Sequence, residues 1–285
     1  MDDVLLAALT DALGAAPVSS AAVSGGDVAQ ASRIDLTDGR RAFVKTHPAP
    51  PPGFFTTEAA GLRWLRDANA VPVPDVLAVS DEPPFLTLEW IDEGRPGAGT
   101  EVAFGRGLAA LHRAGAPSFG REDRRTTGSR GLPNEPCPTW AEFYASQRLL
   151  PLARIARDTG ALPDAAVTDL EQVAGRLTEL GGPPEPPARL HGDLWAGNRL
   201  VDGEGRSWLI DPAAHGGHRE FDLAMMRLFG GFGPDCFDAY DESHPLADGW
   251  EERVPLHQLA PLVVHAIKFG GGYVAGTTQA LARLH

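Results

Sequence analysis

The sequence has few of the features that mark secreted, membrane-spanning or nucleic-acid-binding proteins. It contains two cysteines, Cys137 and Cys236, which form neither a CxxC pair nor a disulfide framework. A reducing compartment is the simpler interpretation. Its 25 basic residues are outnumbered by 38 acidic ones, which gives a formal net charge of −13. That acidity argues against nucleic acid and against an anionic membrane surface as partners.

Long apolar runs are also missing. The stretch 259–269 is interrupted by Pro261, His265 and Lys268, so no segment reaches the roughly 18 apolar residues of a membrane span. Residues 1–4 include two aspartates and lack the basic region of a signal peptide. No internal repeat is visible. We therefore expect a cytoplasmic, monomeric protein that does not bind membranes.

The residues that are present form a globular pattern, with 43 % hydrophobic and 22 % charged residues. The first 91 residues predict a helix, three strands, a second helix from Thr56 or Thr57 to about Asn69, and two more strands. An Asp38-Gly39 pair between the second and third strands is a hairpin signal. The expected ranges are 2–13 for the first helix and 18–23, 28–36, 41–46, 71–80 and 85–91 for the strands.

The pattern changes after a glycine-rich stretch at 92–100. Most later segments have helical periodicity, with short strands expected at 188–190 and 208–210. We expect an α+β fold with a small β-rich lobe at 1–91, a linker at 92–100 and a larger helical lobe at 101–285. Clefts between lobes are common ligand sites. The helical ranges are 100–114, 138–158, 163–180, 221–230 and 257–270.

Three polar residues stand at the ends of the two short strands. Asp193 and Asn198 lie five apart in the loop after the first strand, and Asp211 ends the second. We expect the two strands to form a ribbon that brings these side chains together. Carboxylate and carboxamide oxygens suit Mg²⁺, and a remaining acid can accept a proton from an attacking hydroxyl, as phosphoryl transfer requires. Each residue alone is equally typical of a turn; the combination favours catalysis.

Four segments together carry a family resemblance. The chain resembles the fructosamine kinase (ketosamine-3-kinase) family, in the aminoglycoside-phosphotransferase and choline-kinase branch of the protein-kinase-like fold, from about residue 24 onward. The resembling segments are HGDLWAGN at 191–198, IDPA at 210–213, GHREFDLAM at 217–225 and HAIKFGGGY at 265–273.

The resemblance implies a function and roles. It implies that ATP phosphorylates a sugar hydroxyl of a ketosamine, a glycation adduct, in a step that leads to deglycation. Asp193 would be the catalytic base, and Asn198 and Asp211 the Mg²⁺ ligands. Two alternatives stay open: an aminoglycoside, choline or amino-alcohol kinase of the same fold, and a pseudokinase that binds nucleotide to regulate a partner.

The first lobe contains a candidate ion pair. Lys45 lies near the end of a predicted strand, and Glu58 lies on the same helical face as two leucines. A buried carboxylate needs a cation, which favours pairing with Lys45. In kinase-like folds such a pair directs the lysine to the nucleotide phosphates. The alternative is a solvated lysine and a glutamate that interacts with the helix dipole.

Two further segments of the first lobe match nucleotide contacts of kinase-like folds. Gly25 and Gly26 would turn the chain over the phosphates, although two glycines also mark ordinary hairpins. The loop has no cysteine, unlike that of some family members, so we expect no redox switch there. Glu89, Trp90 and Ile91 match the position of the hinge that pairs with adenine.

The second lobe offers supporting and substrate candidates. Asp222 begins a helix that is apolar nearly all round, so we expect it to support the catalytic loop. His191 is expected to bond the backbone of that loop. Trp195 is either a packing residue or a wall of the substrate site. Three neighbouring residues of this lobe are candidates for contact with substrate: His218, Arg219 and Glu220.

Overall fold

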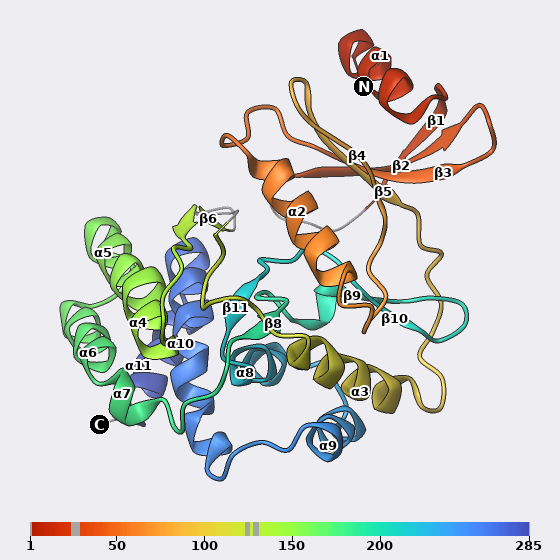
Figure 1. The fold of residues 1–285 in the computed structure, drawn as a ribbon. Coiled ribbons are helices and arrows are strands. Elements are labelled where there is room, and N and C mark those ends of the chain that lie inside the picture. The colour runs from red at the N-terminus through yellow and green to blue at the C-terminus, as the bar shows by residue number, and fades with distance from the viewer. Residues whose placement is uncertain (1, 24–28, 123–125, 128–130, 285) are drawn as a thin grey trace.

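The computed structural model describes residues 2–23, 29–122, 126–127 and 131–284. The N-terminal lobe is built on a five-stranded antiparallel sheet in the order β1-β2-β3-β5-β4 (Figure 1). Its strands run where the sequence predicts strands, with boundaries shifted by a few residues. They are β1 (Pro17–Ala22), β2 (Gln30–Leu36), β3 (Arg41–Thr46), β4 (Val76–Asp81) and β5 (Pro84–Glu89).

Helix α1 (Asp3–Leu13) covers one face of this sheet. Leu9 of the helix and Ile34 of β2 are both fully buried in the cluster that joins them. The β2–β3 hairpin turns at Gly39, whose φ of 85° is the left-handed conformation expected of an Asp-Gly turn. The hairpin prediction is confirmed.

Helix α2 (Phe54–Arg66) lies against the opposite face and faces the second lobe (Figure 1). It begins before Thr56 and Thr57, the predicted starting residues, and Gly53, with a φ of 72°, takes the N-cap position. Phe55, Leu62 and Leu65 are completely buried. Burial of each such side chain contributes about 1.5–3 kcal/mol, so α2 is firmly fixed between the lobes.

The C-terminal lobe is mainly helical, as expected. The expected helix 138–158 is divided into α4 and α5 by a π-helical turn, Ala145–Leu149. Two helices, α9 and α11, were not expected. The helices are α3 (Thr100–Arg113), α4 (Trp140–Tyr144), α5 (Leu150–Thr159), α6 (Asp164–Gly175), α7 (Leu177–Leu180), α8 (Glu220–Phe229), α9 (Pro234–Ser243), α10 (Trp250–Phe269) and α11 (Gly272–Ala282).

Helix α10 begins seven residues before the predicted boundary, and Pro255 lies inside it. A proline removes one helical hydrogen bond and usually ends a helix. Here Leu256, Leu259 and Val263 are buried in the core of the second lobe, and this packing offsets the lost bond.

The short strands pair differently from the prediction. β8 (Ala188–Leu190) pairs with β11 (His215–Gly217), and β10 (Ser207–Leu209) pairs with β9 (Arg199–Val201). The prediction that 188–190 and 208–210 form a single ribbon is therefore wrong. Each of these strands pairs instead with a three-residue strand, β11 or β9, that is too short to be predicted from the sequence. A third pair joins β6 (Thr126–Thr127) to β7 (Leu132–Pro133).

The two lobes share an apolar core. One cluster includes Leu62 of α2, Leu108 of α3 and Leu223 of α8. The connection between β5 and α3 is also fixed, since the Gly94 amide donates to the Val201 carbonyl of β9 at 2.7 Å. The expected α+β two-lobe fold class is confirmed. Among the described residues, no helix has the length and apolar character that crossing a membrane demands.

Candidate active site

Strand β8 leads directly into the segment 191–198, which ends in a 3₁₀ turn, Ala196–Asn198. Gly192 has a φ of 80°, and a Cβ atom there would lie 2.2 Å from the Ala213 carbonyl oxygen. Glycine is therefore required for the close approach of this loop to the one that follows β10. This contact brings the loops of Asp193 and Asp211 together.

Asp222, in the first turn of α8, holds the start of the segment 191–198 that contains the predicted base. Its carboxylate accepts hydrogen bonds from the amides of His191 at 2.8 Å and Gly192 at 2.9 Å. His112 of α3 lies 3.3 Å from the same carboxylate. Burial alone would raise the pKa of Asp222, but the hydrogen bond and charge of His112 lower it. Asp222 thus stays ionised and fixes the start of the loop, which is what a supporting role requires.

Asp193 is oriented by Asn198 and His191. The Asn198 Nδ2 atom donates to Oδ2 of Asp193 at 3.0 Å and to its carbonyl oxygen at 2.8 Å. The Asp193 amide donates to Nδ1 of His191 at 3.2 Å, so Nε2 of this histidine carries the proton and donates to the Ile210 carbonyl at 2.9 Å. The imidazole of His191 thus connects the segment after β8 to Ile210, which follows β10.

Burial raises the pKa of Asp193 to about 7. The hydrogen bond from Asn198 opposes this shift, whereas the charges of Asp211 and Asp222 add to it. A base is most effective when its pKa is near the working pH. The environment of Asp193 therefore suits proton acceptance near neutrality.

Asp211 links the two lobes. Its φ of 54° is left-handed, a conformation that aspartate tolerates better than most residues. Its carboxylate forms an ion pair with Lys45 of β3, whose Nζ atom also lies 2.8 Å from Oε1 of Glu58 on α2. The Lys45–Glu58 pair that the sequence favours is thus present, and it extends to Asp211.

These three charges are buried together. Burial alone would lower the pKa of Lys45, but the charges of Glu58 and Asp211 raise it. Burial likewise raises the pKa of Glu58 to about 7, against the opposing charge of Lys45. A lysine held by two carboxylates is a fixed cation at the inner end of the site.

The donor set at the loop ends suits Mg²⁺. The Nδ2 atom of Asn198 points to Asp193, which leaves its amide oxygen as the atom that a metal would use. The same Nδ2 atom lies 3.5 Å from the Asp211 carbonyl, so both residues occupy one corner. A carboxamide oxygen beside a carboxylate matches the hard oxygen ligands that Mg²⁺ prefers.

The remaining nucleotide candidates lie at the edge of the first lobe. Glu89 ends β5, and its backbone amide donates a hydrogen bond to the Asp75 carbonyl oxygen at 2.9 Å. The Trp90 indole donates to Asp92 at 3.0 Å, and Ile91 is buried. These residues connect the sheet to the second lobe. Gly25 and Gly26 lie outside the described residues.

Trp195 stands on the open side of the catalytic loop. Its side chain is 42 % exposed, two residues after Asp193. A Cβ atom at Gly197 would lie 2.3 Å from the indole, so glycine makes room for the ring. The indole also contacts the Phe229 ring, at 6.3 Å between ring centres, so this position is compatible with both interpretations left open by the sequence.

The three predicted substrate residues have a different environment. His218, Arg219 and Glu220 are 3, 4 and 1 % exposed. Arg219 forms a bidentate ion pair with Glu185, with both distances 2.7 Å. Glu220 is paired with Arg253. These side chains do not form an open surface toward substrate, because all three are buried and internal ion pairs use the charged groups of Arg219 and Glu220.

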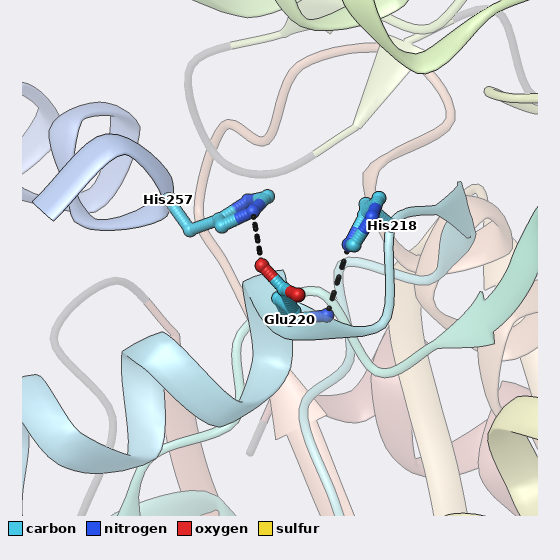
Figure 2. Close-up of side chains that lie close together, drawn as sticks. All are labelled: His218, Glu220 and His257. Carbon is cyan, nitrogen blue, oxygen red and sulfur yellow. Dashed lines mark hydrogen bonds and ion pairs between the residues drawn. The ribbon is translucent and has the colours of Figure 1, made fainter. Parts of the chain in front are cut away.

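Figure 2 shows that His218, Glu220 and His257 point toward one another. Two imidazoles and a carboxylate within 4.8 Å could in principle hold a metal. However, Arg253 donates to both carboxylate oxygens, at 2.9 and 2.6 Å. Burial alone would raise the pKa of Glu220, but the bonds of His257 and Arg253 lower it to about 2.

The guanidinium already balances the carboxylate, so a divalent ion would add uncompensated buried charge. We interpret this group as an ion-pair cluster that fixes α8 to α10. Glu220 lies two residues before Asp222, so the cluster also fixes the residue that holds the catalytic loop.

Sequence reasoning missed three residues that shape the site: His112, Arg253 and Lys268. His112 and Arg253 contact their partners across 110 and 33 residues, and no local pattern signals such contacts. The charge of Lys268 lowers the pKa of Asp193. In the sequence it appears as an interruption of an apolar run and within the segment 265–273 that resembles the family, but neither signal assigns it a role at the site.

Comparison with known proteins agrees with this geometry. The family model for fructosamine kinase matches residues 1–285. A probable ketoamine kinase of Enterococcus faecium is 36 % identical over 260 residues, which cover 91 % of this chain and 92 % of that protein.

Solved structures extend the comparison. A crystal structure assigned to a fructosamine-3-kinase of Thermobifida fusca superposes with a TM-score of 0.91 at 43 % identity, covering 99 % of this chain and 100 % of that one. An aminoglycoside phosphotransferase in complex with ADP and hygromycin B has a TM-score of 0.64 at 16 % identity, covering 98 % of each chain. The second likeness shows the protein-kinase-like fold alone. With a family model that spans all its residues and a relative of this similarity, the chain belongs to the fructosamine kinase family.

Proposed function

We propose that this protein is a ketoamine kinase that transfers the γ-phosphoryl group of ATP to a sugar hydroxyl of a ketosamine. The observation that carries the proposal is the arrangement of Asp193 and Asn198 on one loop beside Asp211, with Lys45 and Glu58 behind them. This arrangement has the parts that phosphoryl transfer needs: a base, metal ligands and a fixed cation. Membership of the fructosamine kinase family supports the acceptor class.

The residues divide the reaction between them. A substrate hydroxyl donates a hydrogen bond to the carboxylate of Asp193, and its oxygen attacks the γ-phosphorus. As the new P–O bond forms, ADP leaves and the hydroxyl proton passes to Asp193. Lys45, held by Glu58, contacts phosphate oxygens of the nucleotide. Asn198 and Asp211 would hold Mg²⁺, which supplies positive charge to the phosphates.

The first experiment is a turnover screen. The protein, ATP and ribulosyl- or fructosyl-lysine are incubated with and without Mg²⁺, and product is detected by mass spectrometry. We expect a mass increase of one phosphoryl group that requires Mg²⁺ and disappears in Asp193→Asn. Choline and an aminoglycoside serve as comparison acceptors. Turnover of either one without any ketosamine turnover would contradict the proposed acceptor, and tight Mg²⁺-dependent ATP binding without turnover would indicate a pseudokinase.

We further propose a division of labour along the chain. Residues 1–91 form the nucleotide lobe, 92–100 the hinge, and 101–285 the catalytic and substrate lobe; Gly25, Gly26 and the segment 89–91 contact ATP. We also propose a monomer in the cytoplasm, which agrees with the free, buried thiols of Cys137 and Cys236. Light scattering and cell fractionation test these two points.

A further inference from the structure

The chain is unusually sparing in lysine. Of its 25 basic residues, two are lysines, Lys45 and Lys268. Lys45 lies on the nucleotide side of the site. Lys268 lies in the last turn of α10, is exposed, and its Nζ atom is 4.8 Å from the ring centre of Phe269. The second lysine therefore stands beside an aromatic ring at the end of α10.

A row of ring contacts connects Lys268 to the catalytic loop. Trp195 meets Phe229 at 6.3 Å between ring centres, and Phe229 meets His265 at 4.8 Å. His265 in turn meets Phe269 at 5.6 Å. The row therefore runs from two residues after Asp193, across α8, to the end of α10.

The two ends of this row are open to solvent. Trp195 is 42 % and Phe269 is 53 % exposed. Exposed aromatic rings beside a catalytic base form a surface for the apolar faces of a ligand. The cation at the far end defines the ligand further, because a lysine ammonium is a compact donor that attracts an anionic group.

We propose that Lys268 and Phe269 bind the carrier end of the ketosamine, with the ammonium of Lys268 contacting a carboxylate and the ring of Phe269 contacting the carrier's carbon chain. This inference rests on the proposed function. It names a substrate class: ketosamines of free amino acids or short peptides whose carboxylate lies near the glycated nitrogen. In this arrangement the sugar lies over Trp195 with its reacting hydroxyl at Asp193.

The acidity of the site explains why a single cation determines whether an anionic carrier group can bind. Asp193, Asp211 and Glu58 make the inner site acidic, and Lys45 is held by two of these carboxylates. An anionic carrier group would be repelled by this surface unless a cation met it. Lys268 is that cation on the side of the site where the ring row lies.

The test compares two acceptors that differ in one charge, ribulosyl-glycine and ribulosyl-glycinamide. We expect wild-type kcat/KM to favour the acid by about five- to tenfold, the order expected for a charge-assisted hydrogen bond at a partly exposed position. Lys268→Gln should reduce this ratio to near one, mostly through KM of the acid. Lys268→Arg should retain most of the ratio, and added salt should reduce it in the wild type.

One control variant, one further test variant and a folding measurement separate this effect from others. Arg154→Gln removes an exposed cation of α5 and should leave the ratio unchanged. Phe269→Ala should weaken binding of ribulosyl-phenylalanine more than that of ribulosyl-glycine. Melting temperatures of all variants identify any loss of folding, because a lysine in the last turn also interacts with the helix dipole.

The outcomes are distinct. A wild-type ratio near one, or a ratio that Lys268→Gln leaves unchanged, overturns the inference while the ketoamine kinase activity stands. An equal loss on both acceptors also overturns it, because that result places Lys268 at the transferred phosphoryl group. Absence of turnover on either acceptor, and on ribulosyl-lysine, contradicts the proposed function itself.

Discussion

The side-chain amide of Asn198 donates a hydrogen bond to the carboxylate of Asp193 at 3.0 Å. This single contact orients the proposed base and turns the amide oxygen of Asn198 away from it, toward the corner shared with Asp211. The proposed base and the proposed metal ligand are therefore positioned by one another.

Replacing Asn198 with alanine should affect both roles. The hydrogen bond from Asn198 lowers the pKa of Asp193, so its loss should move the acidic limb of the pH–rate profile to higher pH. We expect kcat to fall by about 100-fold or more, the order seen when a positioned catalytic group is removed. Mg²⁺ titrations of kcat check the metal role. An unshifted profile with unchanged Mg²⁺ dependence would contradict this assignment.

The activity of the wild type should depend on pH through Asp193. Because burial raises its pKa to about 7, the carboxylate is increasingly protonated below that pH and cannot accept the substrate proton. We expect kcat/KM to decline about tenfold per pH unit well below 7. A profile flat from pH 5 to pH 8 would mean that Asp193 is not the titrating base.

The contribution of Asp193 to folding stability should depend on pH in the opposite direction from its contribution to activity. The raised pKa means that the folded state binds the proton of Asp193 more tightly than the unfolded state does. Stability from this group is therefore present at low pH and is lost as the pH rises from about 4 to about 7. Asp193→Asn cannot ionise, so its melting temperature should exceed that of the wild type by more at pH 8 than at pH 5. Differential scanning fluorimetry without nucleotide measures this.

Loss of the Lys45–Glu58 pair should weaken nucleotide use. In Glu58→Gln, Lys45 keeps Asp211 as a partner but loses the carboxylate that holds it on the side of α2. We expect kcat/KM for ATP to fall by about 10- to 100-fold, from loss of positioning, with a smaller change in KM for the ketosamine. Glu171→Gln, which removes an exposed partner of Arg157, is the matched control. Equal effects of the two substitutions would argue against the assignment.

The cluster in Figure 2 should behave as an ion pair and not as a metal site. Arg253→Met leaves the carboxylate of Glu220 buried without its main partner, which costs about 3–5 kcal/mol. Arg253→Met combined with Glu220→Gln should recover part of that loss in urea unfolding. Dialysis against a chelator should leave the melting temperature of the nucleotide-free protein unchanged. Stoichiometric zinc in the purified protein would contradict this interpretation.

The sequence by itself determined the elements whose signals are local. Three of these signals each lie within a short segment: the Asp38-Gly39 turn, the apolar faces of α1 and α2, and the motif at 191–198. Neighbouring residues alone are enough to predict a turn, a helix or a loop from them. The same holds for the identity of Asp193, Asn198 and Asp211 as candidates, since they lie at the ends of short apolar strands.

Only the tertiary structure decided which distant residues meet. His218, Arg219 and Glu220, expected at the substrate surface, are buried. Arg219 and Glu220 are held in ion pairs by Glu185, Arg253 and His257, which are far away in the sequence. The strands β9 and β11 are three residues long and form only by pairing. Phe229 of α8 contacts His265 of α10 because the two helices pack together, and no local pattern encodes that packing.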